Sequence, residues 1–169
     1  SKATCTRAIN DLSASGLISQ TAEGTNKWIT TAYTKSELLE KAYGRLKTPV
    51  DRILYVKGTA QIEHPIASGI RALARQSMIG VNDQDGAIAI SKKEAAKIPA
   101  EDICTKQYFE DFGGAVIEVW SYDPIILERD GCVDDISLLL SMDNDPNERV
   151  QTCLDEIRQK HGLPIKEEE

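Results

Sequence analysis

The chain has 169 residues, of which 41% are hydrophobic and 28% are charged, and its formal net charge is -7. A chain of this length and composition can bury about 70% of its unfolded surface, which predicts one folded domain or two small ones. No apolar run approaches the roughly 20 residues needed to cross a bilayer, and the first residues lack the apolar core of a signal peptide. We therefore expect a cytoplasmic protein with no membrane partner.

The cysteines and histidines lack the spacing of a metal centre. The two histidines stand alone, without the HExxH pattern or another ligand spacing. The four cysteines form no CxxC pair, and we expect them to be reduced thiols buried in the core. They are Cys5, Cys104, Cys132 and Cys153. We expect neither a metal nor a cofactor.

Charge is distributed unevenly along the chain. Residues 1–57 carry nine Lys or Arg against five Asp or Glu, a net charge of +4. Residues 58–169 carry 11 against 22, a net charge of -11. A basic first third and an acidic remainder predict different roles for the two parts.

The basic third begins with a predicted helix and hairpin. Apolar residues recur at helical spacing over residues 1–15, and Gly16 suits the position of a helix C-cap. Residues 17–31 contain two short β-prone runs on either side of the polar tip 22–26. This pattern predicts a β-hairpin.

Helices and strands alternate irregularly in the remainder. In chain order, the predicted elements are a helix after the capping box of Thr34 and Glu37, a strand at 53–56, a helix opened by Pro65, a strand at 87–90, a helix capped by Ser91, a strand at 115–122, a short helix capped by Asp134 or Asp135, and a last helix from Asp145 onward. The strand at 115–122 is apolar on both faces apart from Glu118, which predicts a central position in the sheet. The predicted fold class is therefore α/β (α+β), with a partial winged helix at 1–33, a mixed α/β domain at 34–165 and a disordered tail at 166–169.

The segment SKATCTRAINDLSASGLI at residues 1–18, followed by the predicted hairpin, resembles the recognition helix and wing of bacterial MarR-like winged helix-turn-helix regulators. The resemblance implies that the helix enters the major groove of double-stranded DNA and that the wing lies on the flanking backbone or minor groove. A helix-turn-helix needs a preceding helix that crosses the DNA backbone. Either roughly 40 to 60 residues precede Ser1 in the complete protein, or this segment does not read DNA.

Periodicity indicates which side of this helix would face DNA, if Cys5, Ile9 and Leu12 face the core. Arg can pair with guanine and Asn with adenine, Thr can contact base edges, and Lys can neutralise phosphates. The predicted DNA-binding residues are Lys2, Ala3, Thr6, Arg7 and Asn10 in the helix and Thr25, Asn26 and Lys27 in the wing. The alternative is an ordinary amphipathic helix with a polar outer face.

Three segments of the acidic remainder resemble the C-terminal part of uncharacterised bacterial winged-helix proteins similar to abortive-infection, type IV antitoxin regulators. They are residues 116–124, 130–141 and 145–150. The resemblance implies a domain for dimerisation, effector sensing or binding of a protein partner such as a toxin.

Few acidic or basic residues outside the predicted helix suggest chemistry. Glu118 is the carboxylate best suited to a functional role because its neighbours imply burial, although a salt bridge or hydrogen bond at a sheet edge is the simpler interpretation. Arg71 and Arg75 with Ser68 form either an anion-binding face or solvated helix surface. Residues 143–154 begin like a calcium loop but lack its glycine and its final glutamate.

The sequence therefore predicts a non-enzymatic, homodimeric DNA-binding transcriptional regulator. The alternative function is a protein-interaction or small-ligand-binding module whose basic helix is incidental.

Overall fold

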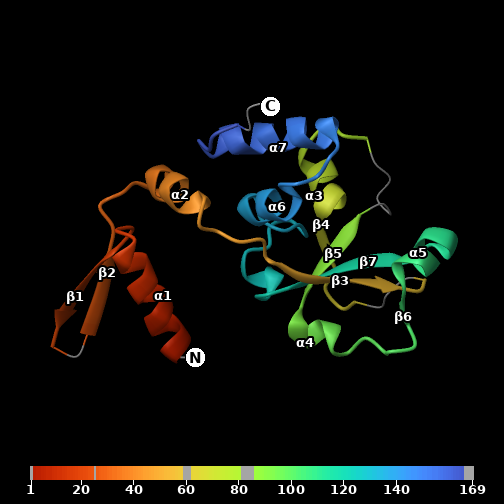
Figure 1. Cartoon of the computed structure of the whole chain (residues 1–169), viewed down its shortest axis with the longest axis horizontal. Coiled ribbons are helices and arrows are strands. Elements are labelled where there is room, and N and C mark those ends of the chain that lie inside the picture. Colours follow the sequence, from red (N-terminus) through yellow and green to blue (C-terminus); the bar gives the residue numbers. More distant parts are fainter. Residues whose placement is uncertain (1, 25, 59–61, 81–85, 166–169) are drawn as a thin grey trace. The chain divides into compact units, whose positions relative to one another are not determined.

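The computed structural model describes residues 2–24, 26–58, 62–80 and 86–165. The fold is mixed α/β, as the sequence predicts (Figure 1). Contacts divide the chain into two compact units, Ser1–Leu46 with Gln159–Glu169, and Lys47–Arg158. Residues 34–46, which were predicted to belong to the α/β domain at 34–165, therefore lie in the first unit.

The first unit contains a helix, a hairpin and a second helix. Helix α1 spans Lys2–Ala14, strands β1 and β2 span Ser19–Glu23 and Asn26–Thr30, and helix α2 spans Lys35–Tyr43. β1 and β2 pair only with each other and are antiparallel. The predicted helix and hairpin are both confirmed.

The capping box of α2 is also confirmed. The Thr34 hydroxyl accepts a hydrogen bond from the Glu37 N–H, and the Glu37 carboxylate accepts one from the Thr34 N–H. The bonds from the Thr34 backbone and then from its hydroxyl lower the pKa of Glu37. The helix therefore begins where its sequence pattern indicated.

The second unit is built on a five-stranded sheet in the order β4-β5-β7-β3-β6. The strands are β3 (Val50–Val56), β4 (Ile66–Ser68), β5 (Ala87–Ser91), β6 (Ile103–Cys104) and β7 (Ala115–Trp120). β7 is central, as predicted, with β5 parallel on one side and β3 antiparallel on the other. β4 and β6 pair antiparallel at the two edges.

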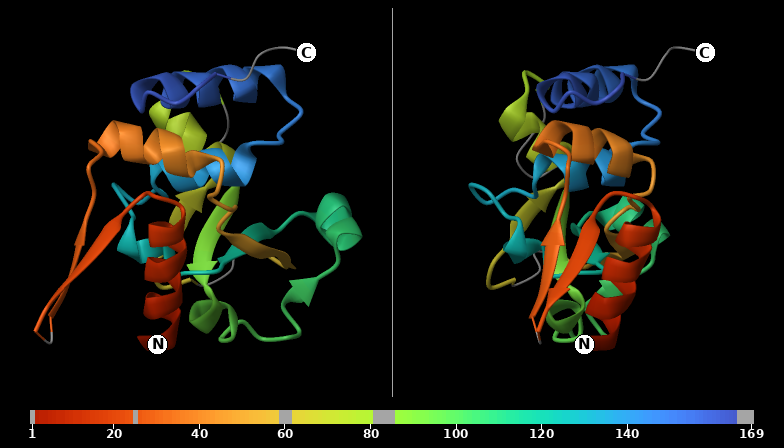
Figure 2. Two further views of the ribbon diagram at one scale, coloured as in Figure 1. Left: turned by 60° about the vertical axis from the view of Figure 1, so that its left-hand side comes forward. Right: turned by 90° about the vertical axis from the view of Figure 1, so that its left-hand side faces the viewer.

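Helices cover both faces of this sheet (Figure 1). They are α3 (Gly69–Gln76), α4 (Lys92–Ala95), α5 (Lys106–Phe112), the 3₁₀ turn η1 (Pro124–Ile126), α6 (Asp135–Met142) and α7 (Glu148–Lys160). α3, α6 and α7 lie on one side and α4 on the other in the views of Figures 1 and 2. Along β7, Ile117 and Val119 pack in the core cluster that includes Ala95 of α4, whereas Glu118 and Trp120 face the opposite side.

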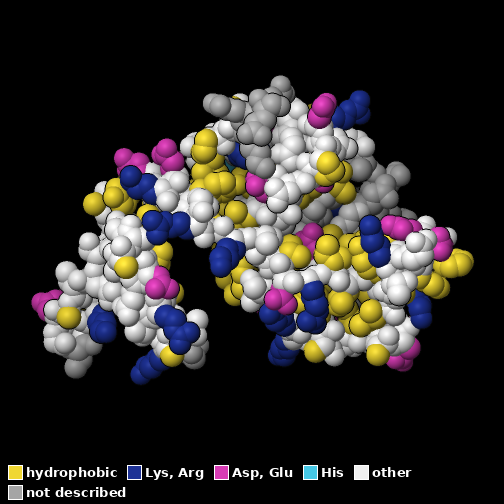
Figure 3. All heavy atoms as spheres, viewed as in Figure 1, with side chains coloured by type: hydrophobic (Ala, Val, Ile, Leu, Met, Phe, Trp, Pro, Cys, Tyr) yellow, Lys and Arg dark blue, Asp and Glu magenta, His cyan; other side chains and the backbone are white. Residues whose placement is uncertain are grey.

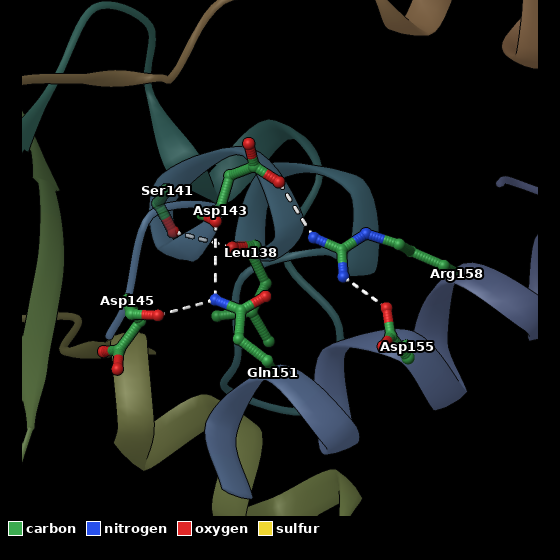
Figure 4. Close-up of polar contacts among 7 residues, drawn as sticks. All are labelled: Leu138, Ser141, Asp143, Asp145, Gln151, Asp155 and Arg158. Atoms are coloured by element: carbon green, nitrogen blue, oxygen red, sulfur yellow. Dashed lines mark hydrogen bonds and ion pairs between the residues drawn. The ribbon is translucent and has the colours of Figure 1, made fainter. Parts of the chain in front are cut away.

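An ion-pair cluster fixes α7 (Figure 4). Arg158 is 1% exposed, and its guanidinium pairs with Asp143 at 2.8 Å and with Asp155 at 2.6 Å. Gln151 Nε2 donates to the carbonyl oxygen of Asp145 at 2.8 Å. Asp143 and Asp145, which lie in the calcium-like pattern of the sequence, therefore hold the end of α6 against α7.

Three expectations need correction. Pro65 does not open a helix, because Ile66–Ser68 forms the edge strand β4 and α3 begins only at Gly69. Of the four cysteines only Cys132 is buried, while Cys5 is exposed. The strand predicted at 115–122 ends at Trp120.

Within the part of the chain that the structure describes, no helix has the length and apolarity required to span a membrane.

Candidate functional site

A glycine-containing helix cap turns the chain from α1 into the hairpin. Gly16 has a φ of 73°, and its N–H donates to the Ser13 carbonyl at 3.0 Å while the Leu17 N–H donates to the Leu12 carbonyl at 3.1 Å. This is the bonding pattern of a Schellman motif, and glycine adopts the positive φ without strain. The reversal buries Leu17 and places the hairpin beside the helix (Figure 2).

Side-chain hydrogen bonds hold the hairpin against α1. Gln20 Nε2 on β1 donates to Ser13 Oγ at 2.9 Å and to Asn10 Oδ1 at 3.5 Å. After β2, Thr31 Oγ1 donates to the carbonyl oxygen of Leu17 at 2.9 Å. Gln20 therefore joins β1 to the helix, and Thr31 joins the end of the hairpin to the turn that follows the helix.

The predicted DNA-binding residues that the structure describes are all exposed. They are Lys2, Ala3, Thr6, Arg7, Asn10, Asn26 and Lys27, while Thr25 lies outside the described residues. Arg7 is separated from Ser13 by about 120° around the helix, so the two side chains leave the helix in different directions. Asn10 differs from the expectation, because its side chain accepts a hydrogen bond from the hairpin instead of pointing to the free side.

The apolar stripe of α1 also differs from the expectation. No residue of α1 is buried in the structure. Cys5 is exposed, Leu12 is 42% exposed and Ile9 is half-buried. The side expected to face a core is thus largely open to solvent.

Trp28 on β2 is a surface residue that sequence reasoning missed. Its side chain is 57% exposed. Ile29, its neighbour, lies opposite Gln20 in the hairpin register and so shares the face that meets α1, which places Trp28 on the other face. Because side chains alternate between the two faces of a strand, Lys27 and Ile29 share one face and Trp28 lies on the other. This alternation in the sequence could have indicated that the aromatic side chain projects outward.

Several cations of the first unit are exposed. Figure 3 shows Lys and Arg side chains over the N-terminal half of α1. Among the described residues, none of the ion pairs involves Lys2, Arg7 or Lys27. Residues 1–46 carry six Lys or Arg and four Asp or Glu, so the local excess of positive charge is small.

The buried Glu118 is held by two hydrogen-bond donors, on the side of the sheet that carries α3. Glu118 Oε2 accepts from Ser68 Oγ at 2.6 Å and from Trp120 Nε1 at 3.0 Å. The expected hydrogen bond to Glu118 is present, but Glu118 lies on the central strand β7 and not at a sheet edge. Ser68 is 0% and Glu118 9% exposed, so Ser68 presents no anion-binding face. Both side chains are therefore shielded from solvent.

A separate pocket of 270 Å³ lies beside η1 in the second unit. It is lined by Glu63, His64, Pro65, Ile66, Ile125, Glu128 and Gly131, and Glu118 is not among these residues. No group of three or more His, Cys, Asp or Glu within the described ranges is arranged to hold a metal ion. No family model, curated protein or solved structure matches this chain.

Proposed function

We propose that this chain belongs to a DNA-binding transcriptional regulator of cytoplasmic, antitoxin-like type. Helix α1 and the β1–β2 hairpin would read an operator in double-stranded DNA, and the Lys47–Arg158 unit would serve dimerisation, partner binding or effector sensing. The observation that carries the proposal is the exposed helix that a Schellman turn connects to an antiparallel hairpin, with Gln20 bonded to Ser13. A recognition helix followed by its wing would have this arrangement, which supports the proposal.

Selection from a library of randomised DNA duplexes tests the proposal without knowledge of the operator. We expect a sequence motif to be enriched and its affinity to fall steeply with salt concentration, because bound lysines and arginines release counterions from phosphates. Arg7→Ala should cost about 1 to 3 kcal/mol and relax selectivity at one base position. Lys27→Ala should weaken the binding of all duplexes to the same extent.

Trp28 provides a direct optical readout of the hairpin. In a Trp120→Phe background it is the only tryptophan, since the chain contains two, and its fluorescence should change when a selected duplex binds. Lys93→Ala, an exposed lysine of α4, is the matched control and should leave affinity unchanged. No enrichment, or binding that is insensitive to salt, would refute DNA reading.

The pocket beside η1 favours a second candidate, a module that binds a protein or small ligand without reading DNA. A stable chain that selects no duplex but gains thermal stability from a peptide or metabolite would support it.

A further inference from the structure

The turn η1 and the pocket beside it form a surface that DNA binding would leave unused. Three consecutive aliphatic residues, Ile125, Ile126 and Leu127, are 52%, 71% and 48% exposed. Single exposed apolar side chains are common, but contiguous ones often mark an interaction site.

The backbone of this turn is well ordered by hydrogen bonds. Asp123 Oδ1 accepts from the Ile125 N–H at 3.2 Å, and the Asp123 carbonyl accepts from the Ile126 N–H at 3.2 Å. The Pro124 carbonyl accepts from the Leu127 N–H at 3.3 Å, and Pro124 itself is buried. A partner that binds here would have to order side chains only, which lowers the entropic cost of association.

The pocket adds negative charge to the apolar surface. Ile125 belongs to both, so the two are continuous. Glu128 is oriented by a hydrogen bond that its carboxylate accepts from the Gly131 N–H, and among the described residues no basic side chain forms an ion pair with it. Glu63 pairs with Lys97 at 3.5 Å, yet its side chain is 74% exposed and that pair is weakly held.

We propose that this surface binds a basic, apolar segment of a protein partner. A Lys or Arg of the segment would pair with Glu128 and Glu63 in the pocket, and neighbouring apolar side chains would cover Ile126 and Leu127. A small molecule that filled the pocket of 270 Å³ would leave the aliphatic turn exposed. The proposal stands independently of DNA binding.

Selection of peptides from a random 12-residue phage library on the whole chain, at physiological salt, tests this proposal. Enriched peptides should combine a Lys or Arg with adjacent large apolar residues. Glu128→Gln, which keeps an acceptor for the Gly131 N–H, should lower the affinity for a selected peptide about tenfold. Ile126→Asp should lower this affinity to the same extent. Norleucine in place of the basic residue of the peptide should cause a similar loss.

Phe112→Asp and Glu110→Gln are the matched controls. Phe112 is 73% exposed on α5, away from the pocket residues, and Glu110 is a carboxylate of the same helix. Both variants should keep the affinity, and circular dichroism should show that all four are folded. The proposal is overturned by enriched peptides that lack a basic residue, by the absence of any enriched peptide, or by binding that neither Glu128→Gln nor Ile126→Asp weakens. Self-association that Ile126→Asp abolishes would identify a second copy as the occupant and would also overturn it.

Discussion

Glu118 Oε2 accepts hydrogen bonds from a buried hydroxyl and a buried indole, so its removal affects two donors at once. Glu118→Ala leaves the Ser68 hydroxyl and the Trp120 N–H without an acceptor, and we expect the free energy of unfolding to fall by about 3 kcal/mol. Glu118→Gln keeps an acceptor oxygen and should cost only about 1 kcal/mol. Urea denaturation measures both values.

Glu156→Ala on the exposed side of α7 is the control for this pair and should change stability by less than about 0.5 kcal/mol. Equal losses for Glu118→Ala and Glu118→Gln would show that the negative charge itself, and not the accepting oxygen, stabilises the unit.

Tyr122 makes stability depend on alkaline pH. Burial raises the pKa of its hydroxyl, Asp134 raises it further, and the hydrogen bond to Ser137 at 2.5 Å opposes the rise. Because the folded chain holds this proton more tightly than the unfolded chain, the contribution to stability is complete below about pH 10 and is lost as pH rises through the higher folded value.

We therefore expect Tyr122→Phe to flatten the fall in stability between about pH 9 and pH 12. Absorbance titration at the phenolate band should also lose its latest-titrating component in the variant. The chain unfolded in guanidinium is the reference, since its tyrosines titrate near pH 10. An unchanged pH profile would contradict the assignment.

At the scale of elements, Gly114 shows how closely β7 approaches β3. Gly114 has a φ of 144°, and a Cβ at this position would lie 2.2 Å from the Val56 carbonyl oxygen. Gly114→Ala should therefore destabilise the unit by about 3 kcal/mol or more. Gly80→Ala, which meets no atom within 4 Å, is the matched control. Thermal unfolding of the two variants distinguishes them, and similar melting temperatures would be inconsistent with this geometry.

Local sequence patterns predicted the elements whose ends carry caps. The capping box at Thr34, the cap at Ser91 and the apolar strand around Glu118 all appear where expected. The prediction that Pro65 opens a helix was wrong because the three-residue edge strand β4 is too short to show a period. Only the pairing of β4 with β5 defines this strand. The short elements α5, β6 and η1 were missed for the same reason.

The candidate site was predictable only in outline. Helical period and the polar tip indicated α1 and the hairpin, but the orientation of the helix depends on which of its sides meets β1. That contact is made by Gln20 and engages Asn10, which sequence periodicity had placed on the free side. The aliphatic turn after Pro124 could not be anticipated, because consecutive apolar residues usually indicate burial.

At the scale of the molecule, the two units differ in how much side-chain surface they bury. Neither α1 nor α2 contains a buried residue, whereas β5, β7 and α6 are largely buried. We expect amide hydrogen exchange in α1, α2 and the hairpin to be orders of magnitude faster than in β7 and α6, because local opening there exposes little apolar surface. Exchange mass spectrometry measures this difference, and uniform protection across the chain would contradict it.

The central strand pairing also sets an order of events during synthesis. β3 has its long partner in β7, whereas β6 pairs only with Tyr55 and Val56, so Val50–Leu54 can be paired only after β7 has left the ribosome. At about 5 to 20 residues per second, the intervening segment takes several seconds to translate. Throughout that interval Ile53 and Leu54 belong to an unpaired strand segment, and the nascent chain is then most exposed to misassociation and most in need of a chaperone.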